Sequence, residues 1–167
     1  MLSRRNFLLS GAGLAAFAGI GLSGWPRGSA DAADKKFPYA LTDAEWRKKL
    51  TSAQYNILRE NGTEPPFTSP LLKEERVGIY HCVGCDNALY SSKTKFHSGT
   101  GWPSFYESLP NAVGTRIDNS LFVARTEVHC ARCGGHLGHV FDDGPPPTGK
   151  RHCIDGIALD FVPKADA

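Results

Sequence analysis

Five cysteines carry most of the chemistry that this sequence can perform. Four of them form two pairs of the same spacing, Cys82-Val-Gly-Cys85 and Cys130-Ala-Arg-Cys133, and the fifth, Cys153, stands alone. Two such pairs, each at the end of a predicted strand, can bind one zinc ion through four thiolates in a tetrahedral site. Because four thiolates leave no coordination position open, the predicted zinc is structural, and a zinc-dependent hydrolase is excluded.

Two other interpretations of the paired cysteines have to be weighed. A C-x-x-C pair is also the redox motif of thioredoxin-like folds, but the chain lacks the strand–helix–strand pattern of that fold. Two disulfides are the second alternative, since the beginning of the chain predicts an oxidising location. We favour zinc, because two C-x-x-C pairs at matched strand ends are typical of a metal site that joins two parts of a fold.

The lone cysteine has the sequence neighbours of a reactive thiol. Arg151 and His152 directly precede Cys153. Nearby cations lower the pKa of a thiol and raise its thiolate fraction, and the thiolate is the nucleophilic form. A half-buried structural cysteine is the commoner fate of a single cysteine, so the interpretation depends on what surrounds it.

Two histidines and a tryptophan can complete a site around Cys153. His136 and His139 lie in a strand-like segment, and Trp102 lies in a loop rich in Gly and Pro. Most histidines are ordinary hydrogen-bonded polar residues, and most tryptophans in such loops fill a core. Beside a reactive thiolate, however, imidazoles can transfer protons, and an aromatic wall can hold a methyl–sulfur group.

The elements that must position these residues are short helices followed by strands. Thr42 and Glu45 form a capping box, which predicts a helix as far as about Leu50. Ser52 is expected to cap a second helix that ends at Asn61-Gly62. Alternating apolar residues between turn signals then predict five strands, over 77–82, 88–91, 121–129, 137–141 and 157–162. Asp118-Asn119 is expected to be a hairpin turn, and residues 142–149 a surface loop.

The charge balance argues against a nucleic-acid partner. The 167 residues include 19 Lys and Arg against 17 Asp and Glu. Residues 1–32 contain Arg4, Arg5 and Arg27 against Asp31, so 16 basic and 16 acidic residues remain in the rest of the chain. A nucleic-acid-binding protein needs a basic surface to displace counterions, and this chain has no such excess.

Residues 1–32 have the pattern of an export signal. Arg4-Arg5 precedes a mildly apolar, Gly-rich run, and Ala30-Asp-Ala32 is a small-x-small cleavage pattern. The order Ser-Arg-Arg-x-Phe-Leu resembles the bacterial twin-arginine signal, which uses the twin-arginine export machinery. We expect cleavage after Ala32 and a periplasmic protein with a linker over 33–39, one domain over 40–163 and a tail over 164–167. An uncleaved membrane anchor is the alternative, although the run is short and broken by Gly.

Four segments together closely resemble the methionine-R-sulfoxide reductase family (MsrB). They are Tyr80-His-Cys82-Val-Gly-Cys85, Lys95-Phe-His-Ser-Gly-Thr-Gly-Trp-Pro-Ser-Phe105, Arg125-Thr-Glu-Val-His-Cys130-Ala-Arg-Cys133-Gly-Gly-His-Leu-Gly-His-Val-Phe-Asp-Asp-Gly-Pro145 and Arg151-His-Cys153-Ile-Asp155. The likeness covers roughly residues 40–163. It implies a mainly β fold of two small antiparallel sheets with short N-terminal helices and a structural zinc site.

The resemblance also implies an activity and roles for individual residues. The activity is that of a peptide-methionine (R)-S-oxide reductase, which repairs oxidised proteins and peptides carrying methionine-R-sulfoxide. Cys153 matches the nucleophile that becomes a sulfenic acid, and Trp102 matches the ring that lines the pocket for the ε-methyl group. His136 and His139 match paired active-site histidines, with His139 helping to protonate the sulfoxide oxygen, and Arg151 matches an arginine near the nucleophile. The zinc ligands are Cys82, Cys85, Cys130 and Cys133.

The chain departs from the family pattern in ways that affect the chemistry. Asp155 stands where the family often has Asn, and a carboxylate there opposes ionisation of the thiol unless Arg or His pairs with it. Gly156 replaces Ser, and His97 replaces a common Asp. Thr100 occupies the slot of the resolving cysteine that part of the family carries, so a thioredoxin-like or small-thiol reductant is expected to attack Cys153 directly.

A different class of function is a zinc-built binding module without catalysis. A peptide or nucleic-acid adaptor can use the same paired cysteines, although the neutral charge speaks against nucleic acid. A Cys153→Ser variant distinguishes the two classes, since an enzyme loses turnover while it keeps its zinc and its fold.

Overall fold

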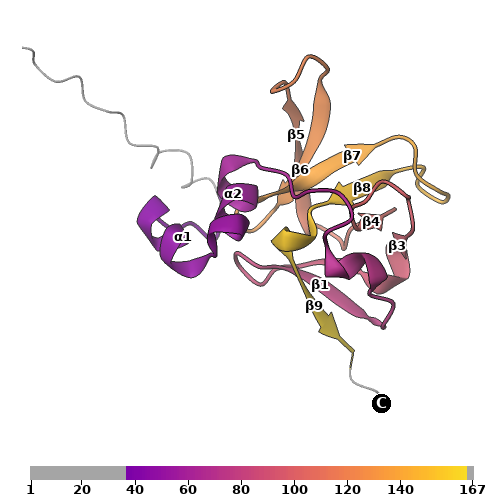
Figure 1. Ribbon diagram of the computed structural model, residues 1–167, viewed down its shortest axis with the longest axis horizontal. Helices are drawn as coiled ribbons and strands as arrows, with labels where there is room; N and C mark the ends of the chain where they lie inside the picture. Colours follow the sequence, from indigo (N-terminus) through magenta and orange to yellow (C-terminus); the bar gives the residue numbers. More distant parts are fainter. Residues whose placement is uncertain (1–36, 165–167) are drawn as a thin grey trace, which may run out of the picture.

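The computed structural model describes residues 37–164 and begins with two short helices (Figure 1). The predicted export signal, residues 33–36 of the linker and residues 165–167 of the tail lie outside the described residues. Within the described part, none of the helices has the length and apolar character needed to cross a membrane.

Both helices begin with capping boxes. In α1 (Asp43–Lys49), the Thr42 side chain accepts from the Glu45 backbone N–H, as expected. In α2 (Ser52–Glu60), however, the cap is Thr51 and its partner is the Gln54 side chain. The prediction of Ser52 as the cap was therefore wrong by one residue, because Gln54 stands three residues after Thr51. Asn61 ends α2 at φ 55°, in the left-handed conformation that was expected there.

The strands of the described chain form two antiparallel sheets, which confirms the mainly β prediction. The small sheet has the order β2-β1-β9 and the large sheet the order β3-β4-β8-β7-β6-β5. The strands of the small sheet are β1 (Gly78–Cys82), β2 (Ala88–Ser91) and β9 (Leu159–Pro163). Those of the large sheet are β3 (Lys95–Phe96), β4 (Ser104–Phe105), β5 (Val113–Asp118), β6 (Arg125–Cys130), β7 (His136–Phe141) and β8 (Arg151–Ile154).

Two predicted strands begin later than their apolar composition indicated. The strand expected over 121–129 begins only at Arg125, because residues 119–124 form the loop of the β5–β6 hairpin. The strand expected over 157–162 begins at Leu159, because Gly156–Ala158 forms the short 3₁₀ helix η5. Apolar, β-branched composition does not separate a strand from an exposed loop when the turn between strands is long.

The core lies between the two sheets. Tyr80 of β1 and Tyr90 of β2 are fully buried and pack on Phe105 of β4, with ring centroids 4.9 Å and 4.4 Å apart. Leu58 of α2 is also buried, and a Cβ on Gly84 would meet its Cδ2 atom at 2.8 Å. Gly84 is therefore needed where the first cysteine pair approaches α2.

Candidate active site and metal centre

One row of side chains crosses the large sheet and brings the predicted nucleophile next to a predicted histidine. Cys153 of β8 lies directly opposite His139 of β7, and on its other side it pairs with Ser104 of β4. His139 in turn pairs with Glu127 of β6. Residues directly opposite each other in antiparallel strands point to the same face, with Cβ atoms about 5 Å apart. The register therefore holds the thiol and the imidazole side by side.

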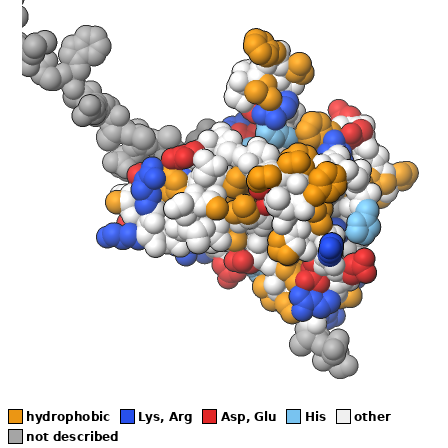
Figure 2. All heavy atoms as spheres, in the orientation of Figure 1, with side chains coloured by type: hydrophobic (Ala, Val, Ile, Leu, Met, Phe, Trp, Pro, Cys, Tyr) orange, Lys and Arg blue, Asp and Glu red, His pale blue; other side chains and the backbone are white. Residues whose placement is uncertain are grey.

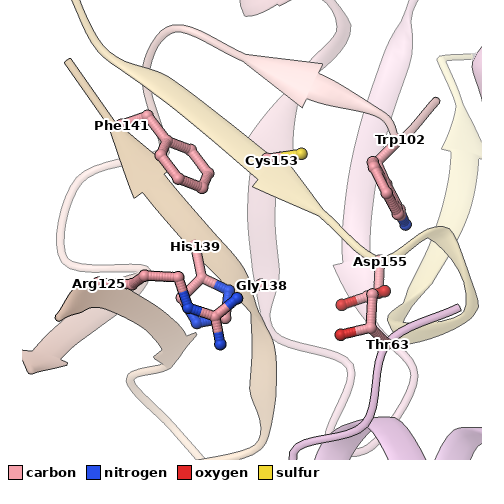
Figure 3. A pocket seen from close by; sticks show the side chains of 8 residues that line it. All are labelled: Thr63, Trp102, Arg125, Gly138, His139, Phe141, Cys153 and Asp155. Atoms are coloured by element: carbon pink, nitrogen blue, oxygen red, sulfur yellow. The ribbon is translucent and has the colours of Figure 1, made fainter. Parts of the chain in front are cut away.

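Cys153 and His139 both line a small cavity (Figure 3). Its volume is about 120 Å³. Its lining residues are Thr63, Trp102, Arg125, Gly138, His139, Phe141, Cys153 and Asp155. Pockets for drug-sized ligands begin at about 300 Å³, so this cavity fits a single side chain rather than an organic cofactor.

Aromatic rings flank the Cys153 thiol on two sides. Figure 3 shows Trp102 and Phe141 on either side of Cys153. The indole Nε1–H of Trp102 donates to the Glu64 carbonyl at 3.1 Å, which fixes the ring. Trp102 thus lies where the sequence predicted an aromatic wall, while Phe141 was not predicted as part of the site.

The strands that carry the site approach each other closely at Gly138. This residue has φ 147°, and a Cβ built on it would lie 2.1 Å from the Cys153 carbonyl oxygen. No other residue type fits between β7 and β8 without moving the backbone that carries Cys153. Gly138 therefore allows β7 and β8 to approach closely at the point where they line the cavity.

Burial, rather than nearby cations, dominates the environment of Cys153. Burial raises the pKa of the Cys153 thiol, and the Asp155 carboxylate adds to that rise. The Thr100 hydroxyl, 3.7 Å from the Cys153 Sγ atom, and the Arg151 guanidinium oppose it. Burial therefore disfavours the thiolate form of Cys153, whereas its sequence neighbours predicted that this form would be favoured.

Of the two residues that precede Cys153, Arg151 forms an ion pair and His152 is a buried ring with a lowered pKa. Arg151 donates from Nε and Nη2 to the Asp143 carboxylate, both at 2.9 Å, and its guanidinium lies 4.4 Å from the centroid of the Phe141 ring. The His152 ring lies 3.1 Å from the Tyr90 hydroxyl, and burial lowers its pKa to about 4. His152 is therefore neutral near pH 7, and the expectation that it acts as a cation beside Cys153 was wrong.

His139 is held by a carboxylate from the β5–β6 hairpin. Its Nε2 atom lies 2.7 Å from Oδ2 of Asp118, and Arg125 donates to the same oxygen at 2.7 Å. A carboxylate only accepts hydrogen bonds, so the proton of the neutral ring is on Nε2 and Nδ1 carries the lone pair. Burial lowers the pKa of His139, while the bond to Asp118 opposes that shift.

His136 lies behind His139 rather than at the cavity. It is buried, its ring centroid lies 5.4 Å from that of His139, and its Nδ1–H donates to Glu127 at 2.9 Å. Burial alone would raise the pKa of Glu127, but hydrogen bonds from His136 and Arg116 outweigh this and lower it to about 2. The two histidines predicted as a pair are thus neighbours, and of the two only His139 lines the cavity.

Asp155 is a buried carboxyl group at the edge of the cavity. Its Oδ1 atom accepts from the Glu64 backbone N–H at 2.8 Å, whereas Arg151 pairs with Asp143 instead. Burial raises the pKa of Asp155 to about 6, and the nearby Glu64 carboxylate adds to that rise. The ionised form of Asp155 is therefore disfavoured, and this carboxyl group titrates close to neutral pH.

The four paired cysteines form a separate, buried cluster. Their sulfur atoms all lie within 4.8 Å of one another, with 3.7 Å between Cys82 and Cys133 and 3.5 Å between Cys85 and Cys130. Zn–S bonds of about 2.3 Å in a tetrahedron separate the sulfurs by about 3.8 Å. The four thiols are not joined as disulfides, and the cluster fits a tetrahedral metal ion.

The turns of the two cysteine pairs use different residues in the left-handed conformation. Gly134 (φ 69°) follows the second pair, and Asp86 (φ 60°) follows the first. In each turn this residue donates its N–H to the carbonyl of the first cysteine at 2.8 Å. Asn87 also approaches the Cys130 sulfur at 3.6 Å, as an N–H group does around a bound thiolate.

Several polar residues of the site were not singled out from the sequence. Asp118 was expected only as part of a turn and Asp143 only as part of a surface loop, and Glu127 and Arg125 were not considered individually. The sequence does contain a signal for Glu127, which lies in the middle of a half-apolar strand. A carboxylate there is rarely buried without a partner, so its position predicts a paired group. No local pattern marks Asp118, because its partner His139 is brought to it by pairing across β6 and β7.

Comparison with known proteins gives a consistent result over most of the chain. A family model described as the SelR domain matches residues 50–163. The chain is 54% identical over 123 residues to the peptide methionine sulfoxide reductase MsrB of Agrobacterium fabrum, which covers 73% of this chain and 91% of that protein. It is 53% identical over 136 residues to the protein of the same name from Leifsonia xyli, covering 80% and 98%. It is 50% identical over 132 residues to the human mitochondrial methionine-R-sulfoxide reductase B2, covering 74% and 72%.

Proposed function

We propose, from the membership of this chain in the methionine sulfoxide reductase B family, that it reduces the R epimer of methionine sulfoxide through a sulfenic acid on Cys153. The chain is a peptide methionine sulfoxide reductase. Its proposed role is the repair of oxidised proteins. The observation that supports this most strongly is the cross-strand pairing of Cys153 with His139 at a one-side-chain cavity beside Trp102. With the reductase activity established, a non-catalytic zinc module is no longer needed to explain the cysteines.

The first step transfers the sulfoxide oxygen to Cys153. The thiolate attacks the sulfoxide sulfur, and the oxygen takes up a proton. The oxygen then bonds to the Cys153 sulfur, while its bond to the methionine sulfur and the new bond between the two sulfurs both break, so that methionine departs as the thioether and Cys153 becomes a sulfenic acid. The methionine sulfur is reduced by two electrons and the Cys153 sulfur is oxidised by two electrons.

His139 is the group best placed to move the proton of this step. Asp118 holds Nε2–H, so Nδ1 is the nitrogen left to exchange protons at the cavity. Neutral His139 can take the proton of the Cys153 thiol at Nδ1 and return it to the sulfoxide oxygen. A transfer of this kind suits a thiol whose pKa burial raises, since the thiolate then forms as substrate binds.

The aromatic walls account for the preference for one epimer. A sulfoxide sulfur carries a methyl group, an oxygen and the rest of the side chain in a fixed handedness. With the methyl group against Trp102, the oxygen faces His139 in only one of the two epimers. The other epimer directs its oxygen toward an aromatic ring, where it has no hydrogen-bond donor.

We further propose that the resident metal is zinc and that its role is structural. Cys82 is the last residue of β1 in the small sheet, and Cys130 is the last residue of β6 in the large sheet. The metal would therefore join the two sheets. Bound zinc supplies stability to a small fold and keeps its four ligands as thiolates. None of the four ligands lines the Cys153 cavity.

The sulfenic acid is proposed to be reduced by an external thiol. The slot beside Cys153 is filled by Thr100, whose Oγ1 atom lies 3.7 Å from the Cys153 sulfur, and the other four cysteines belong to the separate four-cysteine cluster. One thiol from a thioredoxin-like protein or a small molecule displaces water from the sulfenic acid and forms a mixed disulfide. A second thiol then releases Cys153 and leaves with the first as an oxidised disulfide.

Export by the twin-arginine route, with cleavage after Ala32 and a periplasmic location, is proposed from the sequence of residues 1–32. An uncleaved signal that anchors the enzyme to the membrane is the alternative. The size of the protein in an extracted periplasmic fraction separates these two outcomes.

Turnover of the two epimers tests the proposed function. With a dithiol reductant, the full chain is expected to reduce N-acetyl-methionine-R-sulfoxide and the R epimer in peptides, and to leave the S epimer unchanged. Cys153→Ser should abolish turnover while the metal content and the unfolding temperature stay the same. Equal rates on both epimers, or activity in the Cys153→Ser protein, would contradict the proposal.

A further inference from the structure

The hairpin of β5 and β6 projects from the body of the molecule and ends in exposed apolar side chains (Figures 1 and 2). Seven large apolar side chains are exposed within residues 37–164, and four of them are on this hairpin. We call these four the apolar tip; they are Ile117, Leu121, Phe122 and Val123. Phe122 is completely exposed and Val123 is 73% exposed. Such a cluster on one projection marks an interaction surface, because single exposed apolar residues are normally scattered.

The tip is continuous with the rim of the Cys153 cavity. Arg125, which begins β6 at the base of the hairpin loop, lines the cavity, and Asp118, at the other end of that loop, holds His139. Phe122 lies three residues from Arg125, which is at most about 10 Å along an extended chain. A polypeptide whose oxidised side chain occupies the cavity therefore runs within about three residues of the tip.

The charges of the hairpin favour an apolar partner over a charged one. Arg116 pairs with Glu127, and Arg125 pairs with Asp118. Residues 119–124, which form the loop, include no charged residue. The surface therefore offers apolar contact and backbone groups to its partner, rather than a field that attracts an acidic peptide or anionic lipid.

The size of the tip also argues against a second copy of this chain. Four side chains supply a few hundred Å² of apolar surface, whereas a stable dimer buries about 800 Å² on each partner. A single extended segment needs much less. Methionine is an apolar residue of protein cores, so its sequence neighbours are often apolar and become accessible when an oxidised protein unfolds.

We infer that the apolar tip binds apolar residues that flank methionine sulfoxide in an unfolded polypeptide. This rests on the proposed function, because it assigns a docking surface to the same substrate. The tip makes these contacts equally in the ground state and the transition state, so it lowers KM and leaves kcat nearly unchanged. The enzyme is thereby selective for oxidised chains that have lost their fold.

The test compares Phe122→Ser with the wild-type protein on three substrates. These are a peptide with Leu and Val on both sides of methionine-R-sulfoxide, a matched peptide with Gly and Ser, and N-acetyl-methionine-R-sulfoxide. We expect kcat/KM for the apolar peptide to fall about tenfold through KM, which corresponds to about 1.4 kcal/mol. The rates for the other two substrates should stay within about twofold. Val77→Ser is the matched control, because Val77 is 59% exposed and lies beside the small sheet.

Three outcomes would overturn the inference. One is an equal loss on all three substrates, which would place the tip in the chemistry or in folding. The second is no loss on the apolar peptide. The third is a Phe122-dependent dimer in sedimentation, or Phe122-dependent binding to phosphatidylcholine vesicles, without an effect on the apolar peptide. If the wild-type protein fails on N-acetyl-methionine-R-sulfoxide itself, the proposed function is at fault rather than the tip.

Discussion

Replacing Asp155 by Asn is predicted to lower the pKa of Cys153. The change removes a negative charge but keeps an oxygen that can accept from the Glu64 N–H. Asp155 and Cys153 are two residues apart, which is about 7 Å along an extended chain. At that distance two unit charges interact by about 2 kcal/mol at an effective dielectric constant of about 20, and by about 0.6 kcal/mol in water. The expected shift in the pKa of Cys153 is therefore about one unit.

The effect of Asp155→Asn should depend on pH with a definite sign. The pKa of Asp155 is about 6, so its charge is present near pH 7 and is lost as the pH falls toward about 5. Iodoacetamide modification of Cys153, followed by mass spectrometry of the zinc-loaded protein, reports the thiolate fraction. The variant should react about tenfold faster than wild type near pH 7, and the ratio should approach one near pH 5.

Asp160→Asn is the matched control for this prediction, because it removes an exposed carboxylate from β9 of the small sheet. It should leave the reaction rate of Cys153 unchanged at every pH. Slower modification of Cys153 in the Asp155→Asn protein would contradict an opposing effect of the Asp155 charge. An equal increase in the modification rate at pH 5 and pH 7 would also contradict it, since the charge of Asp155 would then not be the cause of the increase.

Three further substitutions test other parts of the account. Thr100→Cys places a thiol where Oγ1 now lies 3.7 Å from the Cys153 sulfur, so one turnover should leave a disulfide between the two positions. Thiol mapping detects this disulfide, and a persistent sulfenic acid would contradict the geometry. Cys82→Ser should lose the metal and several kcal/mol of unfolding free energy, measured by metal analysis and thermal unfolding, and an unchanged unfolding temperature would argue against a structural metal. Asp118→Asn should lower kcat about ten- to a hundredfold with little change in KM, because His139 loses the carboxylate that orients it. A rise in KM with kcat unchanged would contradict the role of His139 in proton transfer.

The parts of the fold that could be predicted are those with local signals. The spacing of Cys82 with Cys85, and of Cys130 with Cys133, predicted a four-thiol cluster because ligand spacing is local and strict. The capping box at Thr42 and the left-handed Asn61 were likewise local and were confirmed. The short strands β3, β4 and β8 were not predicted, because two to four residues carry too little periodicity.

The geometry of the site could not be predicted, because it depends on sheet register. The pairing of Cys153 with His139 is fixed by β7 and β8, and a slip of one residue would put the two side chains on opposite faces. The hydrogen bond between Asp118 and His139 depends on the register of β6 as well. The spacing of the two residues in the sequence therefore does not predict it. The role of His152 was wrong for the same reason, since neighbouring residues of a strand point to opposite faces.

The most direct test of the sulfenic acid mechanism is to identify the oxidised atom after a single turnover. The zinc-loaded protein is mixed with one equivalent of the R epimer in a peptide, without reductant but with dimedone, and its thiols are mapped by mass spectrometry. The proposed mechanism predicts one dimedone adduct on Cys153, retention of the metal, and no adduct when the S epimer is used. A disulfide joining Cys153 to one of the four clustered cysteines, or an adduct on Cys153 with both epimers, would contradict it.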